Sequence, residues 1–169
     1  MQGREDAKKK ALVLLTGGGH LFQTLLLVRK MAGRFDFDYA VVGWGGPPSF
    51  EGLPPGQVYK VVSLSNFSRN SRLGDLYGLC LAFAQCVRIL ARSRPDLVLG
   101  VGTNNVLPLF LAAWPFRIKR VFVESITRVE TPSRTARIVA RLGVANRLYV
   151  QWPGLVGKLP GAAYKGSVL

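Results

Sequence analysis

The amino-acid sequence predicts a single α/β domain, a Rossmann-like parallel sheet of about six strands with helices on both faces. Short apolar runs typical of buried strands alternate with longer stretches that have helical spacing, and no internal repeat interrupts the alternation. A length of 169 residues suits one domain, and a hydrophobic content of 49% favours a globular fold over disorder.

In the first half of the chain, strand signals are apolar runs, and glycine and proline mark the loops. They predict, in order, strand 11–16, a glycine turn at 17–19, helix 21–31, strand 37–43, a Gly- and Pro-rich loop at 44–56, and strand 58–62. Residues 63–72 are polar and connect this half to the next.

The second half begins with the longest helix, in which apolar residues recur at helical spacing. The predicted elements are helix 73–92, strand 97–101, helix 105–114 with an interruption at Pro108, strand 120–124, helix 133–142 and strand 147–151. Residues 157–169 contain no helix long enough to begin another domain. We therefore expect one domain over 1–169, with residues 1–8 as a flexible basic N-terminus.

The carboxyl ends of parallel strands meet at one edge of a sheet, and ligands bind at that edge. The predicted strand ends bring to it residues 17–20, residues 102–105, the pair Glu124-Ser125 and the pair Gln151-Trp152. The sequence thus predicts a site where these polar residues and glycines converge.

The glycine turn consists of Gly17, Gly18 and Gly19, and it precedes His20, the only histidine of the chain. Glycines allow a close backbone approach to a ligand, and the N–H groups of the following helix suit phosphate or a developing negative charge. A histidine beside these groups can exchange a proton near neutral pH. A plain strand-to-helix turn is the alternative interpretation.

The glycine turn does not match two common nucleotide-binding motifs. It lacks the G-x-G-x-x-G spacing and the acidic residue about 20 residues further on that a dinucleotide site has, and it lacks the Lys-Ser/Thr pair of a P-loop. A dinucleotide-dependent oxidoreductase and an NTPase are therefore disfavoured.

Two other strand ends allow a structural or a functional interpretation. Thr103 or Asn104 either caps the following helix or faces a ligand. Glu124 ends the apolar segment VFVES, where an unpaired carboxylate is costly. It either pairs with a nearby arginine or acts near His20 as a general base or as a group that orients a hydroxyl.

The net charge of +14, from 23 basic and 9 acidic residues, favours a polyanionic partner: nucleic acid, an anionic membrane or a phosphorylated substrate. Aromatic residues do not alternate with the basic ones as in single-stranded nucleic-acid binders, so a nucleic-acid role depends on charge alone and is not expected. Six arginines either form a solvated face or, together with Phe67, contact anionic lipid headgroups: Arg69, Arg72, Arg128, Arg134, Arg137 and Arg141.

The cellular setting is predicted from what the sequence contains. Cys80 and Cys86 lie within one helix and do not indicate a disulfide framework, and one histidine excludes a zinc set of the usual kind. No secretory signal is visible, and no run approaches the about 20 apolar residues of a spanning helix. We expect a reduced, cytoplasmic environment and, at most, peripheral membrane contact.

Four segments resemble a known family: LTGGGH, PDLVLGVGT, FVESITRVETPSRTARI and VQWPGL. They are similar to the asparagine-linked-glycosylation subunit fourteen family, whose bacterial relatives include PssD of exopolysaccharide pathways. The resemblance covers residues 9–169. Family members are similar to the N-terminal half of a GT-B glycosyltransferase such as MurG, so the resemblance implies half of a two-subunit enzyme.

The resemblance implies a partner of the subunit-thirteen or PssE type, which binds the UDP-sugar, N-acetylglucosamine or glucuronic acid. This chain would bind a polyprenyl-diphosphate sugar at the cytoplasmic face of the membrane, with no metal and no cofactor besides the UDP-sugar co-substrate. Eukaryotic members carry an N-terminal spanning helix that this sequence lacks. Membrane contact is therefore expected from arginines and from exposed apolar residues, with Leu73, Leu76, Trp114 and Phe116 as candidates.

The resemblance and the strand ends together predict the site residues. His20 is the first candidate for the base that takes the acceptor's proton, or else a phosphate contact, and Glu124 is the competing base. The predicted substrate-binding residues are Gly17, Gly18, Gly19, Thr103, Asn104, Ser125, Arg128 and Glu130. The alternative is a non-catalytic membrane scaffold that recruits and activates the catalytic donor-binding subunit.

Overall fold

The computed structural model describes residues 8–43, 52–64 and 72–168. Most of the basic N-terminus expected at 1–8 lies outside these ranges, as do Phe67 and Arg69. The side chains of Arg72 and Leu73 are not described either, so their predicted membrane contacts stay predictions.

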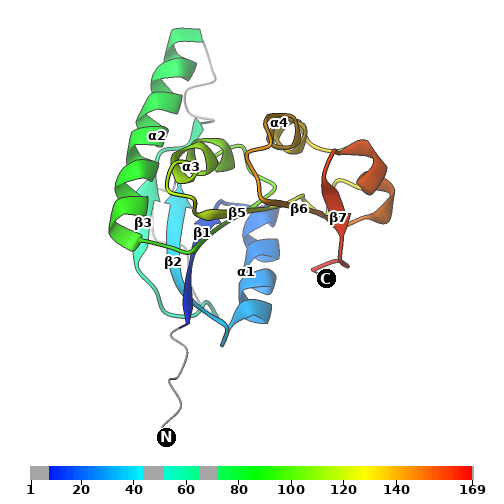
Figure 1. The fold of residues 1–169 in the computed structure, drawn as a ribbon, viewed down its shortest axis with the longest axis horizontal. Coiled ribbons are helices and arrows are strands. Elements are labelled where there is room, and N and C mark those ends of the chain that lie inside the picture. Colours follow the sequence, from blue (N-terminus) through cyan, green and yellow to red (C-terminus); the bar gives the residue numbers. More distant parts are fainter. Residues whose placement is uncertain (1–7, 44–51, 65–71, 169) are drawn as a thin grey trace, which may run out of the picture.

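Seven parallel strands form one sheet, in the order β3-β2-β1-β4-β5-β6-β7 (Figure 1). Their bounds are β1 (Lys9–Leu15), β2 (Phe35–Val42), β3 (Val58–Val61), β4 (Leu97–Val101), β5 (Lys119–Val123), β6 (Arg147–Val150) and β7 (Ala162–Tyr164). The parallel Rossmann-like sheet that the sequence predicts is confirmed, with one strand more than expected.

The sheet is covered on both faces, which explains why its central strands are continuous apolar runs rather than alternating ones. Leu12 and Leu14 of β1 point to one face, whereas Ala11, Val13 and Leu15 point to the other. All five side chains are buried.

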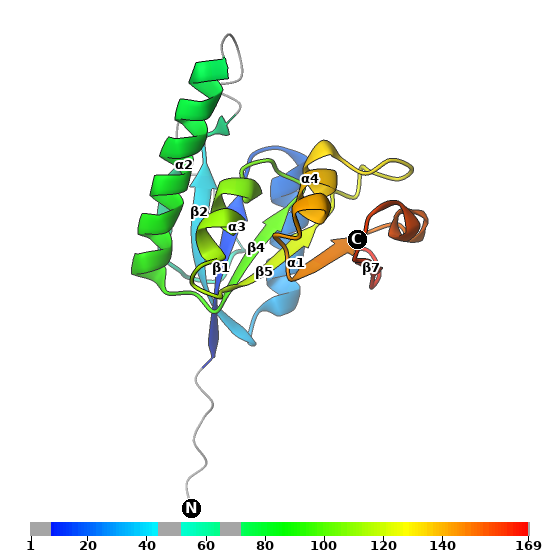
Figure 2. The same ribbon diagram turned by 45° about the horizontal axis from the view of Figure 1, so that its top comes forward.

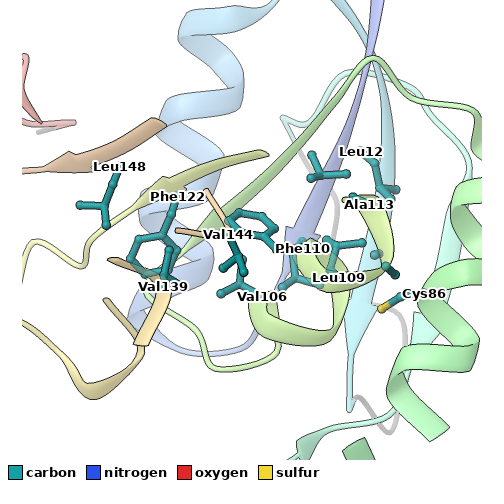
Figure 3. Packing of buried hydrophobic residues seen from close by; sticks show 14 of the residues in the cluster. Leu12, Cys86, Val106, Leu109, Phe110, Ala113, Phe122, Val139, Val144 and Leu148 are labelled. Carbon is teal, nitrogen blue, oxygen red and sulfur yellow. The ribbon is translucent and has the colours of Figure 1, made fainter. Parts of the chain in front are cut away.

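The helices are α1 (Gly19–Met31), α2 (Arg72–Ser93), α3 (Val106–Ala113), α4 (Arg134–Leu142) and the short 3-10 helix η2 (Pro153–Lys158). The helices α2, α3 and α4 pack on one face in a large apolar cluster, part of which is seen in Figure 3 around Phe110 and Phe122. On the opposite face Val28 of α1 packs in a second cluster with residues of β1, β2 and β4.

Three details differ from the sequence-based expectation. Helix α1 begins at Gly19, so His20 lies inside its first turn. Helix α3 runs without interruption through Pro108, because a proline in the first turn removes an N–H that has no intrahelical partner. The additional strand β7 has only three residues, too few for a period-2 pattern to indicate it.

The stretch Leu76–Ser93 of helix α2 is long and apolar enough to cross a membrane, judged by length and composition only. A third of this stretch is buried inside the protein. This corrects the expectation that no stretch approaches a spanning length. Its residues Ala82, Cys86, Ile89 and Leu90 pack in the core of the α/β domain. Figures 1 and 2 both show the first turns of α2 projecting beyond the carboxyl edge of the sheet.

Candidate functional site

A cavity of about 540 Å³ opens at the carboxyl edge of the sheet, where the strand order reverses between β1 and β4. This is the place where open α/β sheets bind ligands, because the helices after the two strands leave toward opposite faces. The cavity is lined by Thr16, Gly17, His20, Val42, Gly43, Ser63, Gly102, Thr103, Asn104, Asn105, Arg128, Ser133, Arg134 and Thr135.

The glycine turn lies at the β1 side of the cavity, where Gly17 lines it and Gly18 and Gly19 do not. Gly18 is the N-cap of α1 and has a φ of 72° and a ψ of −151°, a conformation that other residues avoid. A Cβ atom built on Gly18 or Gly19 meets no atom within 4 Å, so the space in front of the turn is open. The conformation of Gly18 therefore explains the glycine at that position, and the open space leaves room for a ligand at the first turn of α1.

His20 projects from this first turn and packs against the backbone of Gly102. A Cβ atom on Gly102 would lie 2.6 Å from both Cε1 and Nδ1 of the imidazole, and Gly102 also has a φ of 61°. The Nδ1 atom is buried and has no hydrogen-bond partner among the described residues, which leaves Nε2 as the ring nitrogen available to a ligand. Glycine at position 102 is therefore required both by the backbone and by the histidine ring.

The pKa of His20 is lowered, chiefly because burial disfavours the charged imidazolium. The nearby Glu124 carboxylate raises this pKa and Arg128 lowers it, but both effects are smaller than that of burial. The imidazole is thus neutral at pH 7. A neutral imidazole can accept a proton or donate one hydrogen bond to an anion.

The loop between β4 and α3 forms the opposite wall. Thr103 and Asn104 both line the cavity, and their predicted contacts to a ligand stay predictions. Of the two interpretations, capping is met only in part: the N-cap of α3 is Asn105, which makes no side-chain cap bond, and Oγ of Thr103 accepts the N–H of Asn105 at 3.4 Å. The amide of Asn105 instead donates to the carbonyl of Val62 at 2.8 Å and so fastens the segment after β3.

Glu124 follows β5 and is fully buried behind the cavity wall. Its Oε1 accepts the N–H of Ser125 and its Oε2 accepts the N–H of Ser133, both at 2.8 Å. Among the described residues no arginine pairs with it, so the interpretation of Glu124 as half of an ion pair is not supported there. The carboxylate does not line the cavity, and its bonds favour a positioning role over that of a base.

The two hydrogen bonds of Glu124 join the first and last residues of the loop 125–133. This loop carries Arg128, a cationic residue of the site. Arg128 lines the cavity and Ser125 is buried behind Gly102, whereas Glu130 is exposed and outside the cavity lining. The loop ends at Ser133, whose Oγ caps α4 by accepting the N–H of Ala136 at 3.0 Å.

Three helix N-termini converge on the cavity, those of α1, α3 and α4, and none has an acidic residue in its first turn. Arg128 and Arg134 add two full positive charges, and no acidic side chain among the described residues lines the cavity. Helix N-termini and arginines each stabilise bound phosphate. The arrangement suits an anion with more than one phosphate.

The structure brings together Gly17, His20, Thr103, Asn104 and Arg128 of the predicted site. Sequence reasoning missed the part that α4 supplies, Ser133, Arg134 and Thr135, as a ligand-facing helix start. The signal was present, because a serine before a helix is typical of an N-cap. This helix start reaches the site only because the loop 125–133 folds back over the cavity, and no local sequence pattern indicates that fold.

Among the described residues no group of three or more His, Cys, Asp or Glu side chains could hold a metal ion. The cavity offers backbone N–H groups, hydroxyls and arginines, which are donors for an anion rather than ligands for a cation. The expectation of a metal-free, cofactor-free site stays a prediction.

Comparison with known proteins identifies relatives over nearly the whole chain. Residues 57–168 match the family model of Alg14-like oligosaccharide biosynthesis proteins. The UDP-N-acetylglucosamine transferase subunit ALG14 of Mus musculus is 33% identical over 183 residues, covering 95% of this chain and 83% of that protein. The subunit of the same name from Rattus norvegicus is 25% identical, covering 94% and 82%.

A second group of relatives is longer. The UDP-N-acetylglucosamine–N-acetylmuramyl-(pentapeptide) pyrophosphoryl-undecaprenol N-acetylglucosamine transferase of Myxococcus xanthus is 33% identical over 138 residues, and the chain spans about a third (35%) of its length. The crystal structure of MurG from Acinetobacter baumannii shares the fold, with a TM-score of 0.67 and 17% identity over 86% of this chain and 42% of that one. The chain belongs to the Alg14-like family of oligosaccharide biosynthesis proteins and is a glycosyltransferase-related subunit with the fold of a GT-B N-terminal half.

Proposed function

We propose that this chain is the acceptor-binding subunit of a two-subunit, inverting glycosyltransferase, which transfers a sugar from a UDP-sugar to a polyprenyl-diphosphate-linked sugar. The cavity carries the proposal: three helix N-termini, Arg128 and Arg134 face one space beside the neutral imidazole of His20, and no acidic side chain of the described ranges lines it. A diphosphate fits this field, and His20 lines the same cavity, which supports a role for its imidazole at the acceptor hydroxyl.

The relatives support the choice of donor and of acceptor class. The mouse and rat relatives are named as subunits of a UDP-N-acetylglucosamine transferase, and the name of the Myxococcus relative places its sugar acceptor on a pyrophosphoryl-undecaprenol. We propose UDP-N-acetylglucosamine as the donor, held mainly by a second subunit. A GT-B enzyme needs two such α/β domains, and one seven-stranded domain is present in the described chain.

The defining experiment is transfer of labelled N-acetylglucosamine to a short-chain prenyl-diphosphate sugar. The purified chain, a donor-binding subunit from the same organism and the mixture of both are compared, with UDP-glucuronic acid as the alternative donor. We expect product only in the mixture and only from UDP-N-acetylglucosamine. Product from this chain alone would refute the division of substrates, and product from the partner alone would reduce this chain to the scaffold role.

We propose that the first turns of α2 provide the membrane contact. Leu76, Tyr77, Leu79 and Phe83 are exposed on this helix, with exposed fractions from 37% to 65%. The turns project from the same edge of the sheet as the cavity, so their insertion would bring the cavity close to lipid headgroups (Figure 1). The net charge of +14 favours an anionic surface.

The double substitution Leu76→Glu with Phe83→Glu should weaken binding to phosphatidylglycerol vesicles by at least about tenfold in co-sedimentation, because it replaces buried apolar area at the interface by charge. The control is Val58→Glu with Val156→Glu, which changes the net charge equally at two other exposed apolar positions. Equal losses in both variants would mean that charge alone drives binding and that α2 does not insert.

A further inference from the structure

Two buried glutamines lie behind the cavity and join parts of the chain that are far apart in sequence. Gln23 lies in α1, one turn after Gly19, and Gln151 directly follows β6. Each side chain is only 3% exposed. Neither lines the cavity, so their hydrogen bonds describe how the cavity is held rather than what it binds.

Gln23 connects the glycine turn to the end of β5. Its Nε2 donates to the carbonyl of Gly19 at 3.2 Å and to Oγ of Ser125 at 3.3 Å. Its Oε1 accepts the N–H of Ile126 at 2.8 Å and Nε2 of Gln151 at 3.0 Å. The two donors and two lone pairs of the amide are therefore all used.

Gln151 continues the network toward the segment 165–168, which follows β7. Its Nε2 donates to Gln23 and, at 2.9 Å, to the carbonyl of Glu124. Its Oε1 accepts the N–H of Val168 at 3.1 Å and Oγ of Ser167 at 3.5 Å. Lys30 of α1 adds a second tie by donating to the carbonyl of Val168 at 3.0 Å.

We propose that Gln23 and Gln151 are positioning residues that make the arrangement of the glycine turn and the loop 125–128 depend on how the segment 165–168 is seated. The inference rests on the proposed function, because these two parts carry His20 and Arg128 of the diphosphate site. The segment 165–168 would then be a second region of the chain, separate from the cavity lining, that controls the diphosphate site.

The reason lies in what happens when one bond of the network is lost. When Val168 withdraws its N–H, the buried Oε1 of Gln151 keeps only the long 3.5 Å bond from Oγ of Ser167. A poorly satisfied buried amide oxygen is costly, so Gln151 turns to find a better partner. Any such turn breaks its bonds to Gln23 and to the carbonyl of Glu124, and Gln23 then loses a partner beside Gly19 and Ile126. A fully satisfied buried network thus passes a change at one end to the other.

The segment 165–168 is suited to change its seating. Lys165, Gly166 and Ser167 are exposed, and the segment borders a cavity of about 370 Å³ between α1 and the end of β6. Displacing the segment would remove both donors to Oε1 of Gln151 and the carbonyl that accepts from Lys30. The diphosphate site would then respond to a change at residues that do not line it.

The test compares Val168→Pro, which removes the N–H donated to Gln151, with Val168→Ala, which keeps this N–H and shortens the side chain. His20 is the only histidine, so the full chain labelled at the imidazole gives one NMR signal from the site. We expect Val168→Pro to shift this signal and to speed amide exchange at Ile126 by about fivefold or more, and Val168→Ala to change neither. Pyrophosphate, titrated against the same signal, should bind about fivefold more weakly to Val168→Pro.

A second variant tests the other end of the same side chain. Gln151→Glu keeps the acceptors for Ser167 and Val168 but loses the N–H groups donated to Gln23 and to the carbonyl of Glu124. We expect it to change the His20 signal and the exchange at Ile126 at least as much as Val168→Pro does. The proposal is overturned if Val168→Pro behaves like Val168→Ala at His20 and Ile126, whatever Gln151→Glu does. These two measurements need no ligand, so a failure of pyrophosphate to bind even the wild-type chain would count against the proposed function and not against this coupling.

Discussion

Replacing His20 by alanine in the assembled transferase should lower the turnover number by about two to four orders of magnitude, the usual contribution of a positioned acid–base group. His20 lines the cavity, and burial keeps its imidazole neutral at pH 7. The measurement is kcat and KM of sugar transfer with saturating partner subunit. Retention of most of the activity would remove His20 from the reaction.

His20→Gln separates the two roles predicted for this histidine. A glutamine amide can replace Nε2–H as a hydrogen-bond donor to phosphate, but it cannot take a proton at pH 7. If the imidazole is the base, His20→Gln should be as slow as His20→Ala. If it is a phosphate donor, His20→Gln should recover much of the lost kcat/KM.

The pH profile supplies an independent check. Because burial lowers the pKa of His20, we expect the acid limb of kcat/KM that depends on this residue to lie below pH 6.5, histidine's ordinary pKa. The same sign applies to stability: protonation favours the unfolded chain, so the contribution of neutral His20 is complete above pH 6.5 and is lost as pH falls through the lowered folded-state value. An acid limb above pH 6.5 in the wild type that His20→Gln abolishes would contradict a lowered pKa.

Glu124→Ala should lower the free energy of unfolding by about 2–4 kcal/mol, because it leaves the buried N–H groups of Ser125 and Ser133 without an acceptor. For a domain of this size that corresponds to a drop in Tm of roughly 5–10 °C, measured by thermal unfolding. Transfer activity should fall as well, since the loop 125–133 carries Arg128 and leads into α4.

Glu124→Gln provides the comparison, because it keeps one carbonyl acceptor and loses the other. A positioning carboxylate predicts an intermediate Tm and an activity loss that follows the loss of order in the loop. A catalytic base predicts an unchanged Tm with an activity as low as that of Glu124→Ala. The second outcome would contradict the role that the two hydrogen bonds favour.

The fold was predictable because its signals are local. Residues 11–15 are continuously apolar, which indicates a strand buried on both faces, and such strands alternate with helical stretches along the chain. The pattern is weakest where elements are short, so β7 escaped prediction. The start of α1 was placed two residues late because glycine is disfavoured inside helices, although its first position tolerates it.

The site was predictable only to the level of strand ends. The sequence shows that Thr103, Ser125 and Glu124 follow strands, and such residues reach one edge of the sheet. It does not show which of them face the cavity. The structure turns Thr103 into the cavity and uses the side chains of Glu124 and Ser125 for hydrogen bonds behind its wall. The direction of a side chain depends on the loop that packs over it, and loops lack the periodicity on which sequence reasoning depends.

Binding of a prenyl diphosphate in the cavity at the carboxyl edge can be measured on the protein alone. The imidazole-labelled chain is titrated with a short-chain prenyl-diphosphate N-acetylglucosamine and followed through the single His20 signal. We expect saturable binding at one site. The double substitution of Arg128 and Arg134 by alanine should weaken it at least about tenfold, since each arginine lines the cavity and can form charge-assisted hydrogen bonds to phosphate. An unchanged signal, or an equal response to an oligonucleotide, would contradict this expectation.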